Sequence, residues 1–129
     1  MMKKIIFLAI CLILSISICS CAVVDISDSD TATLHFVNGE KNIETAMDEN
    51  DFQAMTEILN GKMLYSDDLS CGFSKDVSVV IDSQTFCFAY DDCATIYLLE
   101  EDKYFNISEE ENKALRQILT LYGFEFPCY

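Results

Sequence analysis

The sequence has few of the residues that nucleic-acid-binding proteins concentrate. Only 8 of its 129 residues are Lys or Arg, against 22 Asp or Glu, and the formal net charge is −14. A chain this acidic repels phosphate backbones and anionic headgroups, which argues against nucleic-acid binding and against membrane adhesion by the polypeptide itself. The charge is consistent with simple solubility, with a cationic partner or with bound calcium.

Residues that could carry catalysis or bind a metal are also scarce. His35 is the only histidine, and it could act as a base only if a serine or cysteine from far along the chain met it. We expect it on the surface of an edge strand instead. The chain has no CxxC pair for thiol-disulfide exchange and no loop with the ligand spacing of an EF-hand. The sequence therefore predicts no catalytic residues, no metal and no cofactor.

A long apolar run is absent as well. The longest run, Ile5 to Ile18, has 14 residues and follows Lys3 and Lys4. A transmembrane helix needs roughly 20 apolar residues, so a cleaved export signal fits this segment better than a permanent span.

The apolar run ends in the four residues Ile18-Cys19-Ser20-Cys21. An aliphatic residue three positions before a cysteine and a small residue directly before it form a lipobox, so residues 1–21 resemble a bacterial lipoprotein precursor. The resemblance implies cleavage between Ser20 and Cys21 and a diacylglycerol thioether on Cys21. It also implies anchoring on the extracytoplasmic side of the bacterial cell membrane. An ordinary secretory signal, with Cys21 as a spare thiol, is the alternative.

Removal of residues 1–20 as a signal peptide changes the composition of what remains. Loss of Lys3 and Lys4 takes the formal charge from −14 to −16. We expect residues 21–30, the lipidated cysteine and an Asp- and Ser-rich stretch, to form a solvated tether. Residues 31–129 are then long enough for one extracytoplasmic domain with a modest core.

Four cysteines remain for the mature domain once Cys11, Cys19 and Cys21 are set aside: Cys71, Cys87, Cys93 and Cys128. An even number outside the cytoplasm predicts two disulfides, with a four-cysteine zinc site as the alternative. Alternating residues at 76–81 and 85–90 predict two antiparallel strands, in which facing residue numbers sum to about 165 to 167. This register brings Cys71 close to Cys93, so we expect Cys71–Cys93 and Cys87–Cys128.

Two further strand pairs are predicted. Residues 33–37 and 40–45 flank Asn38-Gly39, a sequence typical of a two-residue turn, and would place Leu34 opposite Ile43. Residues 95–99 and 103–107 flank a second, acidic turn.

Two amphipathic helices complete the expected fold. One begins at Asp48 or Asn50 and ends at Asn60, and the other begins with a capping box of Ser108 and Glu111. The sequence thus predicts an α+β fold: a small antiparallel sheet of hairpins, two amphipathic helices on one face, and disulfide stabilisation.

Two groups of residues could contact a partner. Asp91 and Asp92 beside Cys93 could contact a cation, although a turn, which aspartate favours, is the preferred explanation of such acids. Tyr65, Tyr97, Tyr104 and Tyr129 need not all be buried, and exposed tyrosines favour a binding face. We therefore expect a non-catalytic module that binds an unknown protein or small molecule. The alternatives are a small envelope hydrolase that uses His35 or the Asp91-Asp92 pair, and a structural or assembly component of the envelope.

Overall fold

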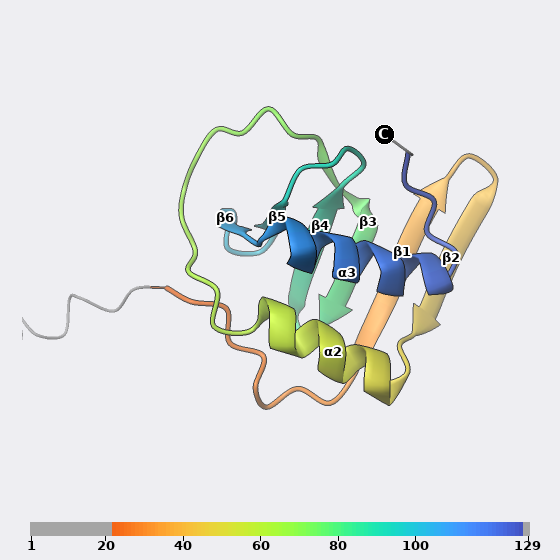
Figure 1. Cartoon of the computed structure of the whole chain (residues 1–129), viewed down its shortest axis with the longest axis horizontal. Helices are drawn as coiled ribbons and strands as arrows, with labels where there is room; N and C mark the ends of the chain where they lie inside the picture. The colour runs from red at the N-terminus through yellow and green to blue at the C-terminus, as the bar shows by residue number, and fades with distance from the viewer. Residues whose placement is uncertain (1–21, 128–129) are drawn as a thin grey trace, which may run out of the picture.

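The computed structural model describes residues 22–127, so Ser20, Cys21, Cys128 and Tyr129 lie outside the described residues. One six-stranded sheet has the strand order β2-β1-β3-β4-β5-β6 with antiparallel neighbours (Figure 1). The predicted antiparallel α+β fold is confirmed. In chain order the elements are β1 (Ala32–Asn38), β2 (Lys41–Ala46), α2 (Glu49–Leu59), β3 (Phe73–Ile81), β4 (Gln84–Ala89), β5 (Thr95–Leu98), β6 (Lys103–Asn106) and α3 (Glu109–Leu121).

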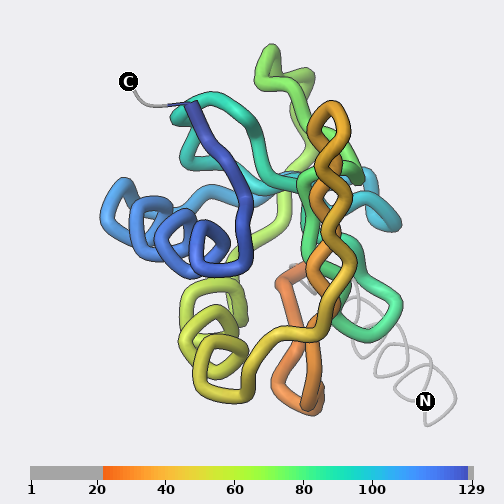
Figure 2. The backbone as a smooth tube through the Cα atoms, turned by 90° about the vertical axis from the view of Figure 1, so that its right-hand side faces the viewer, coloured from red at the N-terminus to blue at the C-terminus, as the bar shows by residue number. Residues whose placement is uncertain are grey.

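Both helices lie on the same side of the sheet in Figure 2. Their buried side chains, among them Met55 and Leu115, join those of the strands in a single hydrophobic core. No helix of the described chain lies on the other side of the sheet (Figures 1 and 2), which we call the open face. The sheet therefore has one buried side and one side on which outward-pointing side chains meet solvent.

The pairing of β3 with β4 follows the predicted register. Val79 lies opposite Phe86 and Ile81 opposite Gln84, and an irregularity in the pairing separates Ser78 from Phe73. Val79, Ile81 and Phe86 are fully buried. The period of two between buried side chains therefore predicted the correct register for this pair.

The turn between β1 and β2 is shifted by one residue from the prediction. Asn38 is the last residue of β1 and pairs with Lys41, so the turn consists of Gly39 and Glu40. Leu34 consequently lies opposite Thr45, and Ile43 lies opposite Phe36. Gly39 has a φ of 62°, a left-handed conformation at the first turn position that glycine adopts at little cost.

Both helices begin at the predicted caps. The Asp48 side chain accepts a hydrogen bond from the Asn50 backbone N–H, and Ser108 and Glu111 form the full capping box. The backbone N–H of Phe124 returns to Leu119 O at 3.2 Å, after Gly123 with a φ of 95°. Local hydrogen-bonding chemistry therefore sets the ends of both helices.

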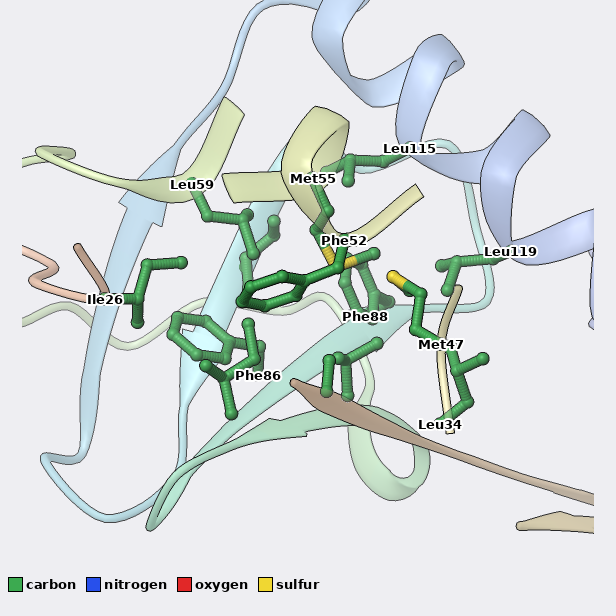
Figure 3. Close-up of a cluster of buried hydrophobic side chains, with 14 of the residues drawn as sticks. Ile26, Leu34, Met47, Phe52, Met55, Leu59, Phe86, Phe88, Leu115 and Leu119 are labelled. Atoms are coloured by element: carbon green, nitrogen blue, oxygen red, sulfur yellow. The ribbon is translucent and has the colours of Figure 1, made fainter. Parts of the chain in front are cut away.

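The expected tether is wrong, because residues 22–30 belong to the folded domain. Val24 and Ile26 are each only 1% exposed. Ile26 points into the same core as Leu59 and Phe86 (Figure 3), and its backbone N–H donates to Asn60 Oδ1 at 2.9 Å. The Asp and Ser content of this stretch suggested a solvated segment. Burial of Val24 and Ile26 instead holds the stretch against the core. The domain therefore begins within three residues of Cys21.

Burial of Ile26 gives a direct test of this packing. Ile26→Ala should lower the free energy of unfolding by about 2–5 kcal/mol, because it leaves a cavity under α2. Val23→Ala is the matched control, since Val23 is 47% exposed; it should change stability by at most about 0.5 kcal/mol. Denaturant unfolding of both variants measures the difference. Equal costs would contradict the packed position of residues 22–26.

Candidate functional site

Four aromatic side chains form a continuous cluster on the open face: Tyr65, Phe73, Tyr97 and Tyr104. Each is half-buried. The Tyr104 ring centroid lies 4.9 Å from that of Tyr97, 5.6 Å from that of Phe73 and 6.2 Å from that of Tyr65. These separations are typical of interacting aromatic pairs. Tyr104 is thus the central ring of what we call the aromatic cluster.

Strand alternation explains why these rings lie outside the core. Ile96, Leu98 and Phe105 are buried, so Tyr97 and Tyr104 point to the open face because successive side chains alternate. The two tyrosines face each other directly across β5 and β6. The core on one side of this strand pair therefore forces its tyrosines onto the other side.

Tyr65 joins the aromatic cluster from outside the six strands. Its backbone N–H donates to Tyr104 O at 2.9 Å, and the Tyr104 N–H donates back to Tyr65 O at 2.8 Å. Residue 65 therefore extends the sheet beyond β6 at a single position. Phe73, at the start of β3, completes the cluster with its ring centroid 5.9 Å from that of Tyr97.

Two of the phenol groups are fixed by neighbouring side chains. Tyr65 donates to Asn106 Oδ1 at 2.6 Å, and Tyr97 donates to Asp102 Oδ1 at 2.9 Å. The hydrogen bond to Asp102 is the main cause that raises the pKa of Tyr97 to about 12, and burial and the negative charge of Asp102 add to it. These hydrogen bonds therefore hold the Tyr65 and Tyr97 rings in place, and the phenol of Tyr97 loses its proton only at a higher pH than an ordinary tyrosine, because its pKa is raised.

His35 also lies on the open face, but it does not contact a nucleophile. β1 lies between β2 and β3, so His35 is not on an edge strand as the sequence suggested. Ser78 lies directly opposite His35. However, the His35 Nδ1 lies 2.8 Å from Lys75 O, and the Ser78 hydroxyl donates to the same carbonyl at 2.5 Å. Ser78 is only 1% exposed, so its oxygen is both hydrogen-bonded and inaccessible.

The predicted disulfide between Cys71 and Cys93 is present, with a Cα–Cα separation of 6.7 Å. It joins the segment before β3 to the loop before β5. Cys87 is buried and is a free thiol among the described residues, and burial together with the charge of Glu100 raises its pKa to about 11. Its expected partner, Cys128, lies outside the described residues, so that pairing stays a prediction.

Asp91 and Asp92 lie in the loop that this disulfide holds. The Asp91 carboxylate accepts the Cys93 backbone N–H at 3.1 Å, which is the turn interaction expected of an aspartate. Asp91 also lies close to both disulfide sulfurs, but those atoms are bonded to each other and are not free to act as metal ligands. Contact of the two acids with a cation or a partner stays a prediction.

Arg116 of α3 makes hydrogen bonds to the start of the same loop and to the end of β4. Its guanidinium donates to Ala89 O at 2.9 Å and to Asp91 O at 2.5 Å, and it lies 4.4 Å from the ring centroid of Phe126. No motif in the sequence marks this residue as functional. Its position on α3 gave no sign of these contacts, because both carbonyls are 25 or more residues away in the chain.

A groove of about 1150 Å³ runs between α3 and the C-terminal segment. Asp92, Asn112, Arg116 and Phe126 are among the residues that line it. Pro127, the last residue that the structure describes, also lines the groove. The aromatic cluster, in contrast, is built entirely from described residues, three on strands and Tyr65 on an isolated β-bridge.

No protein-family model, curated protein or solved structure matches this chain.

The hydrogen bond between Tyr97 and Asp102 has a consequence that titration can measure. In Asp102→Asn the pKa of Tyr97 should fall from about 12 towards the ordinary value, because the main cause of the shift is lost. Tyrosinate absorbance against pH, compared with and without Tyr97→Phe, isolates this group. Because the folded-state pKa is raised, its contribution to stability is complete below pH ~10 and is lost as the pH rises towards 12.

Glu101→Gln is the matched control for this titration. It removes an exposed charge from the same turn, and Tyr97 should still titrate near pH 12 because its hydrogen bond to Asp102 remains. The same Tyr97 transition in both variants would contradict the assignment.

Proposed function

We propose that the protein is a lipid-anchored extracytoplasmic binding module without catalysis of its own, and that the aromatic cluster is its binding face. In this proposal the sheet is built from hairpins, two amphipathic helices cover one of its faces, and the other face is free to bind. The aromatic cluster on that free face is the observation that carries it.

Ordered tyrosines are well suited to recognition. Each ring offers a large apolar surface with little conformational entropy to lose on binding, and the hydroxyl at its edge can hydrogen-bond. Tyr65 and Tyr97 already have their phenols fixed by Asn106 and Asp102. Tyrosine is also one of the residues enriched among binding hot spots.

The alternative of a hydrolase that uses His35 receives less support. A base must lie within hydrogen-bond reach of the nucleophile that it activates. His35 and Ser78 instead both turn to Lys75 O, and Ser78 is buried. We therefore favour binding over catalysis for the open face.

Anchoring through Cys21 rests on the lipobox Ile18-Cys19-Ser20-Cys21. Among the helices that the structure describes, none is long and apolar enough to cross a membrane. Acyl chains on Cys21 would hold the domain at the bacterial membrane, since each buried methylene contributes about 0.8 kcal/mol.

Cys21→Ser tests the anchor. The full-length variant should move from the membrane fraction to the soluble extracytoplasmic fraction, because it lacks the thiol that carries the lipid. Cys87→Ser is the control that leaves the lipobox intact, and it should stay with the membrane. An unchanged membrane fraction for Cys21→Ser would overturn lipid anchoring.

Site-specific photocrosslinking in intact cells tests the binding face. Leu99 and Leu121 offer a matched pair, because both are exposed leucines and Leu99 lies on the open face whereas Leu121 lies on α3. A photoreactive residue at position 99 should capture a specific partner that position 121 does not. Equal capture from both positions would contradict a binding role for the open face.

Tyr104→Ala then tests the aromatic cluster itself. Loss of the central ring should reduce capture from position 99 about tenfold or more, because a hot-spot tyrosine contributes about 2 kcal/mol or more. Tyr104→Phe keeps the ring and should retain capture, which separates loss of contact from loss of folding. Undiminished capture by Tyr104→Ala would remove the aromatic cluster from the proposal.

A further inference from the structure

Two apolar side chains are exposed side by side at the start of the domain. Val23 is 47% exposed and Met63 is 64% exposed, and their residues pair across an antiparallel β-bridge. The Val24 N–H donates to Lys62 O at 2.9 Å, and the Leu64 N–H donates to Ala22 O at 3.0 Å. Backbone hydrogen bonds therefore hold the two short segments together.

Alternation of side chains explains why this pair is exposed. Val24 is fully buried and Leu64 packs against the core. Their neighbours Val23 and Met63 must then point away from the core, as alternate residues of extended segments do. The exposure of Val23 and Met63 thus results from the packing of Val24 and Leu64 against the core. The pair is not a frayed end of the chain.

The exposed pair lies very close to the residue expected to carry lipid. Only Ala22 separates Cys21 from Val23, and consecutive Cα atoms are about 3.8 Å apart, so Val23 lies within about 8 Å of Cys21. Because Val24 is already in the core, no solvated spacer can lift the domain away from the bilayer. A lipid on Cys21 would bring Val23 and Met63 to the membrane surface.

We propose that Val23 and Met63 contact the lipid bilayer beside the anchored Cys21. This contact would set the orientation of the domain relative to the membrane. This inference rests on lipid attachment at Cys21. Transfer of exposed apolar side chains from water into the interfacial region lowers the free energy of the membrane-bound state. The pair would therefore add an orienting contact to an anchor that is otherwise a flexible attachment.

Neighbouring charges limit the contact to a shallow one. The Lys62 ammonium lies 2.9 Å from a Glu111 carboxylate oxygen, so its charge is already paired. Asp25 is exposed, and hydrogen bonds from the Ser27 hydroxyl and backbone N–H lower its pKa. An ionised Asp25 must stay in water, so the chain can enter the interface only as far as Val23.

This orientation also determines how far the aromatic cluster lies from the membrane. Tyr65 follows Met63 by two residues and points to the same side, about 7 Å further along the extended chain. The aromatic cluster would therefore begin close to the membrane surface, and a partner bound there would lie near the bilayer.

Tryptophan fluorescence offers a test without background, because the chain contains no Trp. The lipidated protein, expressed from the full-length sequence with Met63→Trp, is reconstituted into phosphatidylcholine vesicles with or without brominated acyl chains. The bromolipid should quench the emission about twofold, because interfacial side chains reach about 5–10 Å into the boundary between headgroups and acyl chains. Leu121→Trp, at the C-terminal end of α3 and ten residues beyond Glu111, should be unaffected. Val23→Trp is a second reporter in case Met63→Trp perturbs folding.

Flotation with the vesicles separates failure of the anchor from failure of the contact. Quenching of Trp at position 63 or 23 but not 121, and its loss when Cys21→Ser is added, would support the bilayer contact. Floating protein with no quenching at either position 23 or 63 would overturn the contact and leave the lipid anchor intact. Protein that does not float would overturn the anchor and, with it, this inference.

Discussion

The antiparallel pairing of β3 with β4 fixes which side chains of this domain reach the core. Val79 lies opposite Phe86 in this pair, and a slip of one residue would turn every inward side chain of either strand to the open face. Beyond the irregularity between Ser78 and Phe73, the two strands continue to the end where Cys71 is bonded to Cys93 and Phe73 contacts the tyrosines of β5 and β6. The core, the disulfide and the aromatic cluster therefore all depend on this strand pair.

Features set by local interactions could be predicted from the sequence. The caps at Asp48 and Ser108 depend on hydrogen bonds within three residues, and they were placed correctly. Alternation of apolar residues gave the register of β3 with β4, and that register gave the disulfide between Cys71 and Cys93. The turn at Gly39 was misplaced by one residue, because Asn-Gly and Gly-Glu can each supply the positive φ that the turn needs.

Features set by contacts between distant parts of the chain could not be predicted. Ile26 lies in an acidic stretch that is typical of a linker, yet its partner Asn60 is 34 residues away. Tyr65 reaches the aromatic cluster through a single backbone pairing with Tyr104. In the candidate site, the alternation of side chains along β5 and β6 is enough to place Tyr97 and Tyr104 on the open face. The addition of Tyr65 and Phe73 required the tertiary structure.

The acidic surface and the aromatic cluster impose different requirements on a partner. A formal charge of −14 over the whole chain favours an approaching cationic surface and disfavours an anionic one at long range. The rings act only at contact, where apolar area and shape decide the free energy of binding. For the proposed binding role, these features would together favour a partner with an apolar segment surrounded by basic residues.

The bond between Cys71 and Cys93 makes a covalent ring that contains all of β3 and β4. Cleavage of any one peptide bond inside this ring would leave the two pieces of the chain attached to each other. The pieces would keep their neighbours in the sheet, and every remaining backbone hydrogen bond could still form. A protease would therefore have to cut the ring twice before it could separate any fragment of the two central strands from the rest of the ring.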